Sequence, residues 1–314
     1  MIESHSKLRA TNLVTRRGGN CPNSLEVLQQ LLLLHDPSVA AVRPYLVTCL
    51  PGRSTASSRR VFSSFDGPGP DGKSPIDFTH CIHREGRVEA ASSYAIRSAE
   101  TGSRTLVSYN DLDDMTVGEF ERVVRSFDPK QSTWWHFEGR IPDITLACIN
   151  LLRRLLPGAK ISVEVERPGR LGLMDMAAEA DVVFYSRTWA EDQGHDSAEA
   201  CLRNQDIPKA SLALCTWGSK GAVALSRFTG HDSTSTSTAG IIHCPVPGNV
   251  TTVVDTLGAG DTFVAGMLYG LLCHADWDTE RQVNFAVHLA SLKVQQDGFA
   301  RLGDAVREAG IDLT

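Results

Sequence analysis

The sequence predicts an α/β protein built on a mostly parallel sheet, with a small antiparallel hairpin beside it. From Trp134 onward, short apolar runs of strand length alternate with helical patterns of about 10–15 residues, which is typical of βαβ units. In the first half, Ser92–Arg97 and Arg104–Tyr109 are strand-like, and a connection containing glycine joins them as a hairpin. A chain of 314 residues is also long enough to bury a sizeable core.

The expected elements follow one another along the second half of the chain. Strand-like runs lie at Trp134–Phe137, 161–165, 181–185, Leu212–Thr216, 222–225 and 252–254. Helical patterns lie at 143–156, 262–273 and 281–295, and an earlier helix begins near Ser24. Residues 53–86 carry Gly, Pro and Ser without a clear period, so we expect a loop there.

Composition excludes several classes of protein. A net charge of −6 and a pI near 5.9 argue against a nucleic acid or a membrane surface bound through charge. The chain has no run of about 18 apolar residues and no apolar stretch of a signal peptide near its start. Its eight cysteines are scattered without a Cys-x-x-Cys pair, which favours reduced thiols. We therefore expect a single cytoplasmic domain over residues 1–314.

Residues 67–74 match the Walker A phosphate-binding pattern letter for letter, but we expect an exposed loop. A P-loop binds phosphate through consecutive backbone N–H groups, and Pro68 and Pro70 have none. The motif must also open a helix, and residues 75–83 show no helical period.

A second glycine-rich segment, at residues 255–261, has the context that a phosphate site needs. The expected strand at 252–254 leads into a turn containing Gly258 and Gly260, and an apolar helix follows. These glycines let a ligand approach the backbone closely. The first N–H groups of a helix have no intrahelical partner, and the helix dipole adds about half a positive charge there. The segment therefore predicts an anion site suited to a phosphoryl group.

The carboxyl group of Asp261 lies within this predicted site. We expect the positive end of the helix to keep Asp261 ionised, ready to accept a proton from an alcohol. Phosphoryl transfer demands little of such a base, because its loose transition state releases the proton late. The alternative is an ordinary capping aspartate after a glycine turn.

Residues 255–263 resemble the C-terminal signature of the PfkB (ribokinase-like) carbohydrate kinases, and especially that of the ketohexokinases. The likeness extends in the same order to residues 17–23, 101–105, 135–140 and 163–168, and it is poorest between about 52 and 91. It implies a ribokinase-like three-layer α/β sandwich with a small β lid, contributed by about 5–17 and 92–109. It also implies ATP as phosphoryl donor and a sugar hydroxyl as acceptor.

The resemblance carries roles over to individual residues. It makes Asp261 the catalytic base and a sugar contact, and it forms the anion hole, which also binds nucleotide, from Gly258, Ala259 and Gly260. It places the sugar on Gly19, Asn20 and Asn23. Asparagine suits this role because it offers a donor and an acceptor to neighbouring hydroxyls. A plain turn before the helix near Ser24 is the alternative for residues 18–20.

The nucleotide contacts implied by the resemblance lie in two other segments. Arg104 matches an arginine that contacts the nucleotide phosphates, which suits its permanent charge, although a solvated surface arginine is the alternative. A loop between two strands matches the nucleotide-binding loop, with a hairpin turn as the alternative. Its residues are Gly218, Ser219, Lys220 and Gly221.

The chain departs from the family pattern at two places. Only 17 residues precede Gly18 and none of them has the pattern of an apolar strand, so we expect the first strand of the family's main sheet, with its sugar-binding aspartate, to be missing. Residues 186–189 lack the Asn and Glu of the family's magnesium motif. Mg²⁺ would then be held mainly by phosphates and water. Its protein ligands are unknown, with Glu166 and Asp255 as candidates.

These observations predict an ATP- and Mg²⁺-dependent kinase for a small sugar, such as the ketohexose fructose. Other ketoses, ribose or a nucleoside remain open as acceptors, and pairing of lids in a homodimer is open as well. We expect no nucleic-acid or membrane partner. The alternative is a non-catalytic or damaged nucleotide-binding relative that lacks the N-terminal strand, or a sequence whose true start lies upstream.

Overall fold

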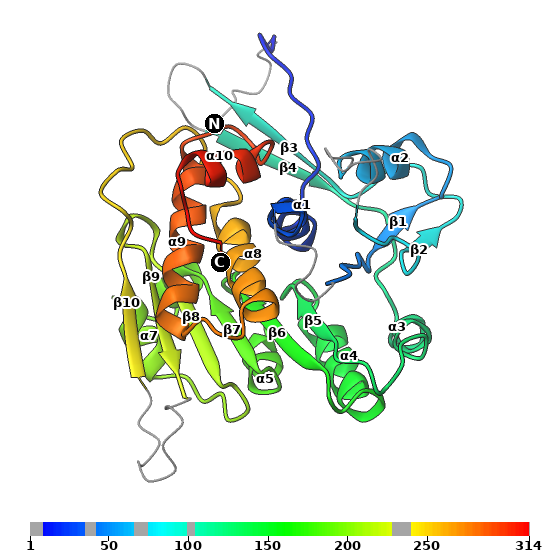
Figure 1. Ribbon diagram of the computed structural model, residues 1–314. Coiled ribbons are helices and arrows are strands. Elements are labelled where there is room, and N and C mark those ends of the chain that lie inside the picture. The colour runs from blue at the N-terminus through cyan, green and yellow to red at the C-terminus, as the bar shows by residue number, and fades with distance from the viewer. Residues whose placement is uncertain (1–8, 35–41, 66–74, 99–103, 228–239, 314) are drawn as a thin grey trace.

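The computed structural model describes residues 9–34, 42–65, 75–98, 104–227 and 240–313. Its central sheet has six strands in the order β10-β9-β8-β7-β6-β5 (Figure 1). The bounds are β5 Trp134–Phe137, β6 Lys160–Val165, β7 Val182–Tyr185, β8 Leu212–Thr216, β9 Ala222–Ser226 and β10 Gly240–Cys244. Strands β5 to β8 run parallel, whereas β9 and β10 are antiparallel to their neighbours. The predicted parallel sheet is confirmed.

Helices cover both faces of this sheet (Figure 1). Alternate strand residues point to opposite faces. One face, including Val163 and Val183, packs against α3 Val117–Val124, α4 Pro142–Leu155, α5 Leu173–Ala178 and α7 Ala198–Arg203. The other face, including Phe184 and Leu214, packs against α8 Ala259–Cys273 and α9 Thr279–Val294. The result is a three-layer α/β sandwich.

Helix α1, Asn20–Leu34, lies against α8. Val27 and Leu31 of α1 are buried in one apolar cluster with Ala265 and Tyr269 of α8. This packing brings the first turn of α1 beside the first turn of α8. Helix α10, Leu302–Glu308, belongs to the same cluster. Short helix α6, Arg187–Asp192, and the 3₁₀ turn η1, Gly218–Lys220, complete the second half.

The predicted hairpin is confirmed with the expected bounds. Strands β3 Ser92–Arg97 and β4 Arg104–Tyr109 pair antiparallel in a sheet of their own (Figure 1). Residues 9–17, which we expected to contribute to the lid, form no strand, and 5–8 lie outside the described residues. That the whole chain is one domain remains a prediction. None of the described helices has the length and apolar character needed to cross a membrane.

Two other expectations are wrong. Residues 53–86 contain the helix α2 Ala56–Ser63 and the strand β2 Ile82–Arg84, which pairs with β1 Cys49–Pro51. Helix α2 is capped locally, because the Thr55 side chain accepts from the Ser58 N–H. The strand expected at 252–254 does not form, because the N–H groups of Val254 and Asp255 donate to Val294 O at the end of α9.

The Walker A match at 67–74 lies outside the described residues, and no helix forms at 75–83, as predicted. Within the described residues, β5 pairs only with β6, so it is an edge strand of the six-stranded sheet.

The contact between α8 and α9 depends on Gly266. A Cβ atom there would lie 2.8 Å from Ala286 Cα, which is backbone and cannot swing away. We expect Gly266→Ala to lower the free energy of unfolding by about 1–3 kcal/mol through overpacking. Gly118→Ala is the control, because Gly118 is also helical but has nothing within 4 Å of an added Cβ. Urea unfolding of both variants tests this, and equal effects would contradict it.

Candidate active site

The first turns of α1 and α8 meet through side chains that the sequence analysis placed in one site. Asn23 Nδ2 donates to Asp261 Oδ2 at 2.6 Å, and Ser24 Oγ donates to Asp261 O at 3.0 Å. Asp261 is the third residue of α8, and Asn23 is the fourth of α1. The proposed base and a proposed sugar contact, 238 positions apart in sequence, are therefore neighbours.

The glycine turn before α8 has the geometry of an anion site. Gly258 has φ +79°, and a Cβ atom there would lie 2.2 Å from Phe299 Cζ, so this position requires glycine. Thr262 N donates to Gly258 O at 2.9 Å and closes the first helical turn. Gly260 is exposed and has nothing within 4 Å of an added Cβ, so the backbone is open to a ligand. The residues present fit a phosphate group.

Buried hydrogen bonds orient Asn23. The Arg17 side chain is only 4% exposed, and its Nη1 donates to Asn23 Oδ1 at 2.9 Å. Arg17 also forms an ion pair with Glu26 and lies over the ring of Phe65. With its oxygen held by Arg17, Asn23 must present its NH₂ group to Asp261. The sequence analysis did not identify Arg17 as a site residue.

Three glutamates surround the start of α1, and the sequence analysis missed two of them. Asn20 Nδ2 donates to Glu164 Oε2 at 2.7 Å and to Glu166 Oε2 at 2.8 Å. The Cys21 N–H donates to Glu138 Oε1 at 2.9 Å. Glu138 and Glu166 follow β5 and β6, and Glu164 lies near the end of β6. Carboxyl ends of neighbouring parallel strands meet at one edge, which is the signal that could have found them.

The sequence analysis expected Asp261 to be ionised, but its surroundings favour the protonated form. Burial, followed by the negative charges of Glu164, Glu166 and Glu138, raises the pKa of Asp261 to about 8, although the hydrogen bond from Asn23 lowers it. A helix terminus contributes only about 0.3–1 kcal/mol at an exposed site. The expectation was wrong because that contribution is smaller than the effects of burial and of three nearby carboxylates.

Asp255 anchors the turn that precedes the anion site. Lys293, which is fully buried, donates from Nζ to Asp255 Oδ2 at 2.8 Å and to Asp255 O at 2.9 Å. Burial raises the pKa of Asp255, but hydrogen bonds from Lys293, Leu257 and Gly298 outweigh it and leave that pKa lowered. Because Asp255 already has these donors, it is a poorer candidate for a magnesium ligand than Glu166.

The remaining site residues lie in the two nucleotide segments and at the glycines before α1. Residues Gly218–Lys220 form the exposed turn η1 between β8 and β9. Gly221 closes this turn with φ +89°, where an added Cβ would lie 2.0 Å from Cys244 O. Gly19 has φ +99° and its carbonyl accepts from Asn23 N at 2.9 Å. Arg104 begins β4, but its side chain lies outside the described residues.

Comparison with known proteins identifies the family. The model of the pfkB family carbohydrate kinases matches residues 76–302. The chain belongs to this family. A curated relative, ketohexokinase of Mus musculus, is 28% identical over 300 residues, which cover 90% of this chain and 86% of the relative. The family predicted from residues 255–263 is therefore confirmed, and the protein is a PfkB sugar kinase.

Solved structures of a ribokinase and a fructokinase share the fold. Ribokinase from Giardia lamblia aligns with a TM-score of 0.68 and 15% identity, covering 97% of this chain and 92% of that chain. Fructokinase from Vibrio cholerae O395, with fructose, ADP and calcium bound, aligns with a TM-score of 0.63 and 19% identity, covering 94% and 91%. The ribokinase-like fold is therefore confirmed.

The raised pKa of Asp261 has a measurable effect on stability. An unfolded aspartate ionises near pH 3.9, so between about pH 4 and 8 unfolding releases a proton from Asp261. Wild-type stability should therefore fall as pH rises through this window, and Asp261→Asn should remove that loss. We expect the melting temperature of Asp261→Asn, relative to wild type, to increase from pH 5 to pH 8.

The control for this measurement is Asp175→Asn. Asp175 is also the third residue of a helix, α5, but it is exposed. Its effect on the melting temperature should not change between pH 5 and pH 8. A pH-independent difference for Asp261→Asn would show that Asp261 is ionised throughout.

Proposed function

We propose that this PfkB protein transfers the terminal phosphoryl group of ATP to a hydroxyl of a ketohexose such as fructose. The observation that carries the proposal is the 2.6 Å hydrogen bond between Asn23 and Asp261 at the open first turn of α8. It joins a group that can bind a sugar to a group that can accept its proton. The ketohexokinase relative and the fructokinase neighbour support this acceptor class.

In this proposal the sugar lies between the starts of the two helices. Asn20 and Asn23, with the backbone of Gly19, hold its hydroxyls, and Asp261 accepts the proton of the reacting hydroxyl late in the transfer. The first N–H groups of α8, at residues 258–261, stabilise the phosphoryl group. Asp261 must be ionised for this role, whereas a pKa near 8 leaves it largely protonated at neutral pH. Neutralising the nearby glutamate charges would lower that pKa and favour the ionised form.

The nucleotide is proposed to lie on Gly218, Ser219, Lys220 and Gly221, with Arg104 contacting its phosphates. The V. cholerae fructokinase structure contains ADP and a calcium ion, and another sugar kinase neighbour, from Pyrococcus horikoshii, contains ATP. Mg²⁺ would neutralise phosphate charge, with Glu166 as the candidate carboxylate. The β3–β4 hairpin would act as a lid that excludes water from the donor.

We expect Asp261→Asn to lower kcat for sugar phosphorylation by about 10²–10⁴-fold, the usual contribution of a general base. ATP binding, measured by calorimetry, should stay close to wild type, because the amide preserves the shape of the site. Asp175→Asn should leave kcat unchanged. Retained turnover in Asp261→Asn would exclude Asp261 as the base.

The alternative is a nucleotide-binding protein without kinase activity. It is favoured by β5, an edge strand within the described residues, and by the raised pKa of Asp261. A panel of fructose, other ketoses, ribose and nucleosides, with release of ADP as readout, separates the two. Sugar-dependent ADP release eliminates the alternative, whereas ATP binding without turnover supports it.

We also propose that the lid hairpin pairs two copies of the chain. Four exposed apolar side chains share one face of the hairpin by strand register, namely Tyr94, Ile96, Val107 and Tyr109. Burial of such a face against a second copy would stabilise a dimer.

The double substitution Ile96→Glu and Val107→Glu should convert a dimer to a monomer in sedimentation velocity. Ser108→Glu, on the opposite face of the hairpin, is the control and should leave the mass unchanged. A wild-type protein that is monomeric at micromolar concentration would contradict the pairing.

A further inference from the structure

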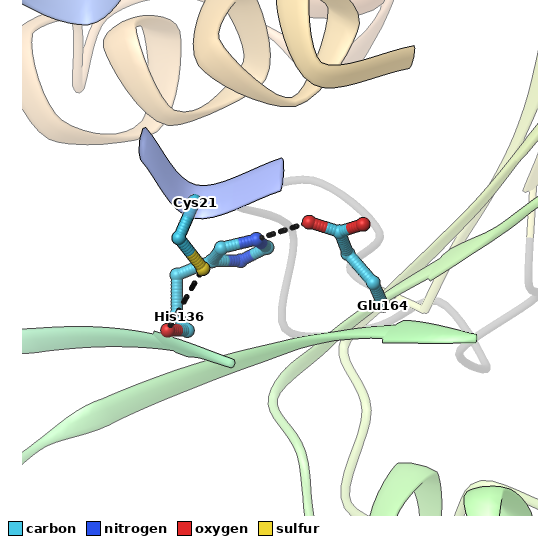
Figure 2. A group of neighbouring side chains, drawn as sticks. All are labelled: Cys21, His136 and Glu164. Carbon is cyan, nitrogen blue, oxygen red and sulfur yellow. Dashed lines mark hydrogen bonds and ion pairs between the residues drawn. The ribbon is translucent and has the colours of Figure 1, made fainter. Parts of the chain in front are cut away.

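Three side chains of types that can bind metals come from different elements and converge at the start of α1. Cys21 is the second residue of α1, His136 lies in β5 and Glu164 in β6 (Figure 2). His136 Nε2 and Glu164 Oε1 are 2.9 Å apart. One ligand atom from each residue lies within 4.8 Å of the other two. Figure 2 shows the thiol and the carboxyl group on either side of the imidazole ring.

The donor set of sulfur, nitrogen and oxygen selects the kind of cation. Thiolate and imidazole suit Zn²⁺, whereas Mg²⁺ prefers oxygen ligands alone. Zinc bonds to these atoms are about 2.0–2.3 Å long, so tetrahedral ligand atoms lie roughly 3.3–3.8 Å apart. The three ligand atoms now lie within 4.8 Å of one another. Side-chain rotations of Cys21 and Glu164 would bring them to the tetrahedral spacing. A fourth position would remain for water.

The histidine is held in place by neighbours, as zinc-binding histidines usually are. Its Nδ1 lies 2.9 Å from Ser162 Oγ, which also accepts from Trp134 Nε1 at 2.8 Å. Ser162 is fully buried. In the metal-bound form Nδ1–H would donate to Ser162. Nε2 would then give up the proton that it shares with Glu164 Oε1 at 2.9 Å, and this proton would leave to the buffer. A bound Zn²⁺ would lie between His136 Nε2 and Glu164 Oε1 and would replace their direct contact.

The charges at this point favour a dication. The Cys21 N–H donates to Glu138 Oε1 at 2.9 Å, and a Glu164 oxygen lies within 4.8 Å of the Cys21 sulfur, so two carboxyl groups lie near the thiol. The thiol must lose its proton to bind a metal. A bound dication would replace that proton, which leaves to the buffer, and would offset the negative charge of the neighbouring glutamates.

We propose that Cys21, His136 and Glu164 bind Zn²⁺, and that the bound ion inhibits the enzyme by competing with the sugar. Asn20, the neighbour of Cys21 and a proposed sugar contact, is held by Glu164 Oε2. Drawing Glu164 onto the ion would move Asn20 out of its present position. The competition with sugar rests on the proposed function, whereas metal binding does not.

Metal binding is tested with Co²⁺ as a spectroscopic probe and Zn²⁺ as its competitor. We expect one Co²⁺ per chain with a thiolate-to-metal absorption band that Zn²⁺ removes and Mg²⁺ does not. Cys21→Ser should weaken Zn²⁺ binding by about 100-fold or more, because loss of a ligand exceeds loss of a supporting contact. Cys49→Ser is the control, since Cys49 is also partly exposed but contacts Arg84. Absence of the band, or equal Zn²⁺ affinity in Cys21→Ser, would overturn the site.

Inhibition is tested separately with the active enzyme. Zn²⁺ should raise the KM for the sugar and leave kcat unchanged in wild type and in Cys49→Ser. Cys21→Ser, whose fold is checked by thermal melting, should keep basal activity and lose this inhibition. Zinc binding without a rise in KM would overturn the competition. If no sugar is phosphorylated, the proposed function fails, and the cobalt spectrum still decides the metal site.

Discussion

The hydrogen bond between Asn23 and Asp261 is the contact on which the proposed chemistry depends. It exists because α1 packs on α8 through buried apolar side chains, which aligns the two helix starts. Glycines precede both starts, with positive φ at Gly19 and Gly258. A small shift between the helices would separate the proposed base from the proposed sugar contact. The apolar contact between α1 and α8 therefore supports the polar site at their N-termini.

This arrangement concentrates negative charge in a partly buried space. Glu138, Glu164 and Glu166 arrive from the ends of β5 and β6, and they raise the pKa of Asp261. The hydrogen bonds from Asn20, and the buried Arg17 behind Asn23, offset part of the cost of bringing these groups together. The same charge makes the site receptive to cations, which links the state of the proposed base to whatever positive charge is bound nearby.

Much of the fold could be predicted from the sequence, because its local signals agree with the final structure. Strands β5 and β8 and both hairpin strands have the predicted bounds, since each is a short apolar run between turn residues. The strand predicted at 252–254 does not form, because the N–H groups of Val254 and Asp255 donate to the end of α9, and Val253 is 62% exposed. The periodicity of a three-residue run cannot distinguish a strand within a sheet from an extended segment outside one. The elements α2 and β2 were missed because polar turn residues obscure their short patterns.

The glycine turn at 258–260 and its place directly before Asp261 could be predicted from the sequence alone, because a local string of residues sets the backbone of that turn. Only the tertiary structure decided that Asn23 lies beside Asp261 and that three glutamates gather near them. It therefore also decided that the pKa of Asp261 is near 8. The same holds for the cluster of Cys21, His136 and Glu164, which lie on three separate elements. Desolvation and charge interactions depend on distances between such elements, and sequence spacing does not contain those distances.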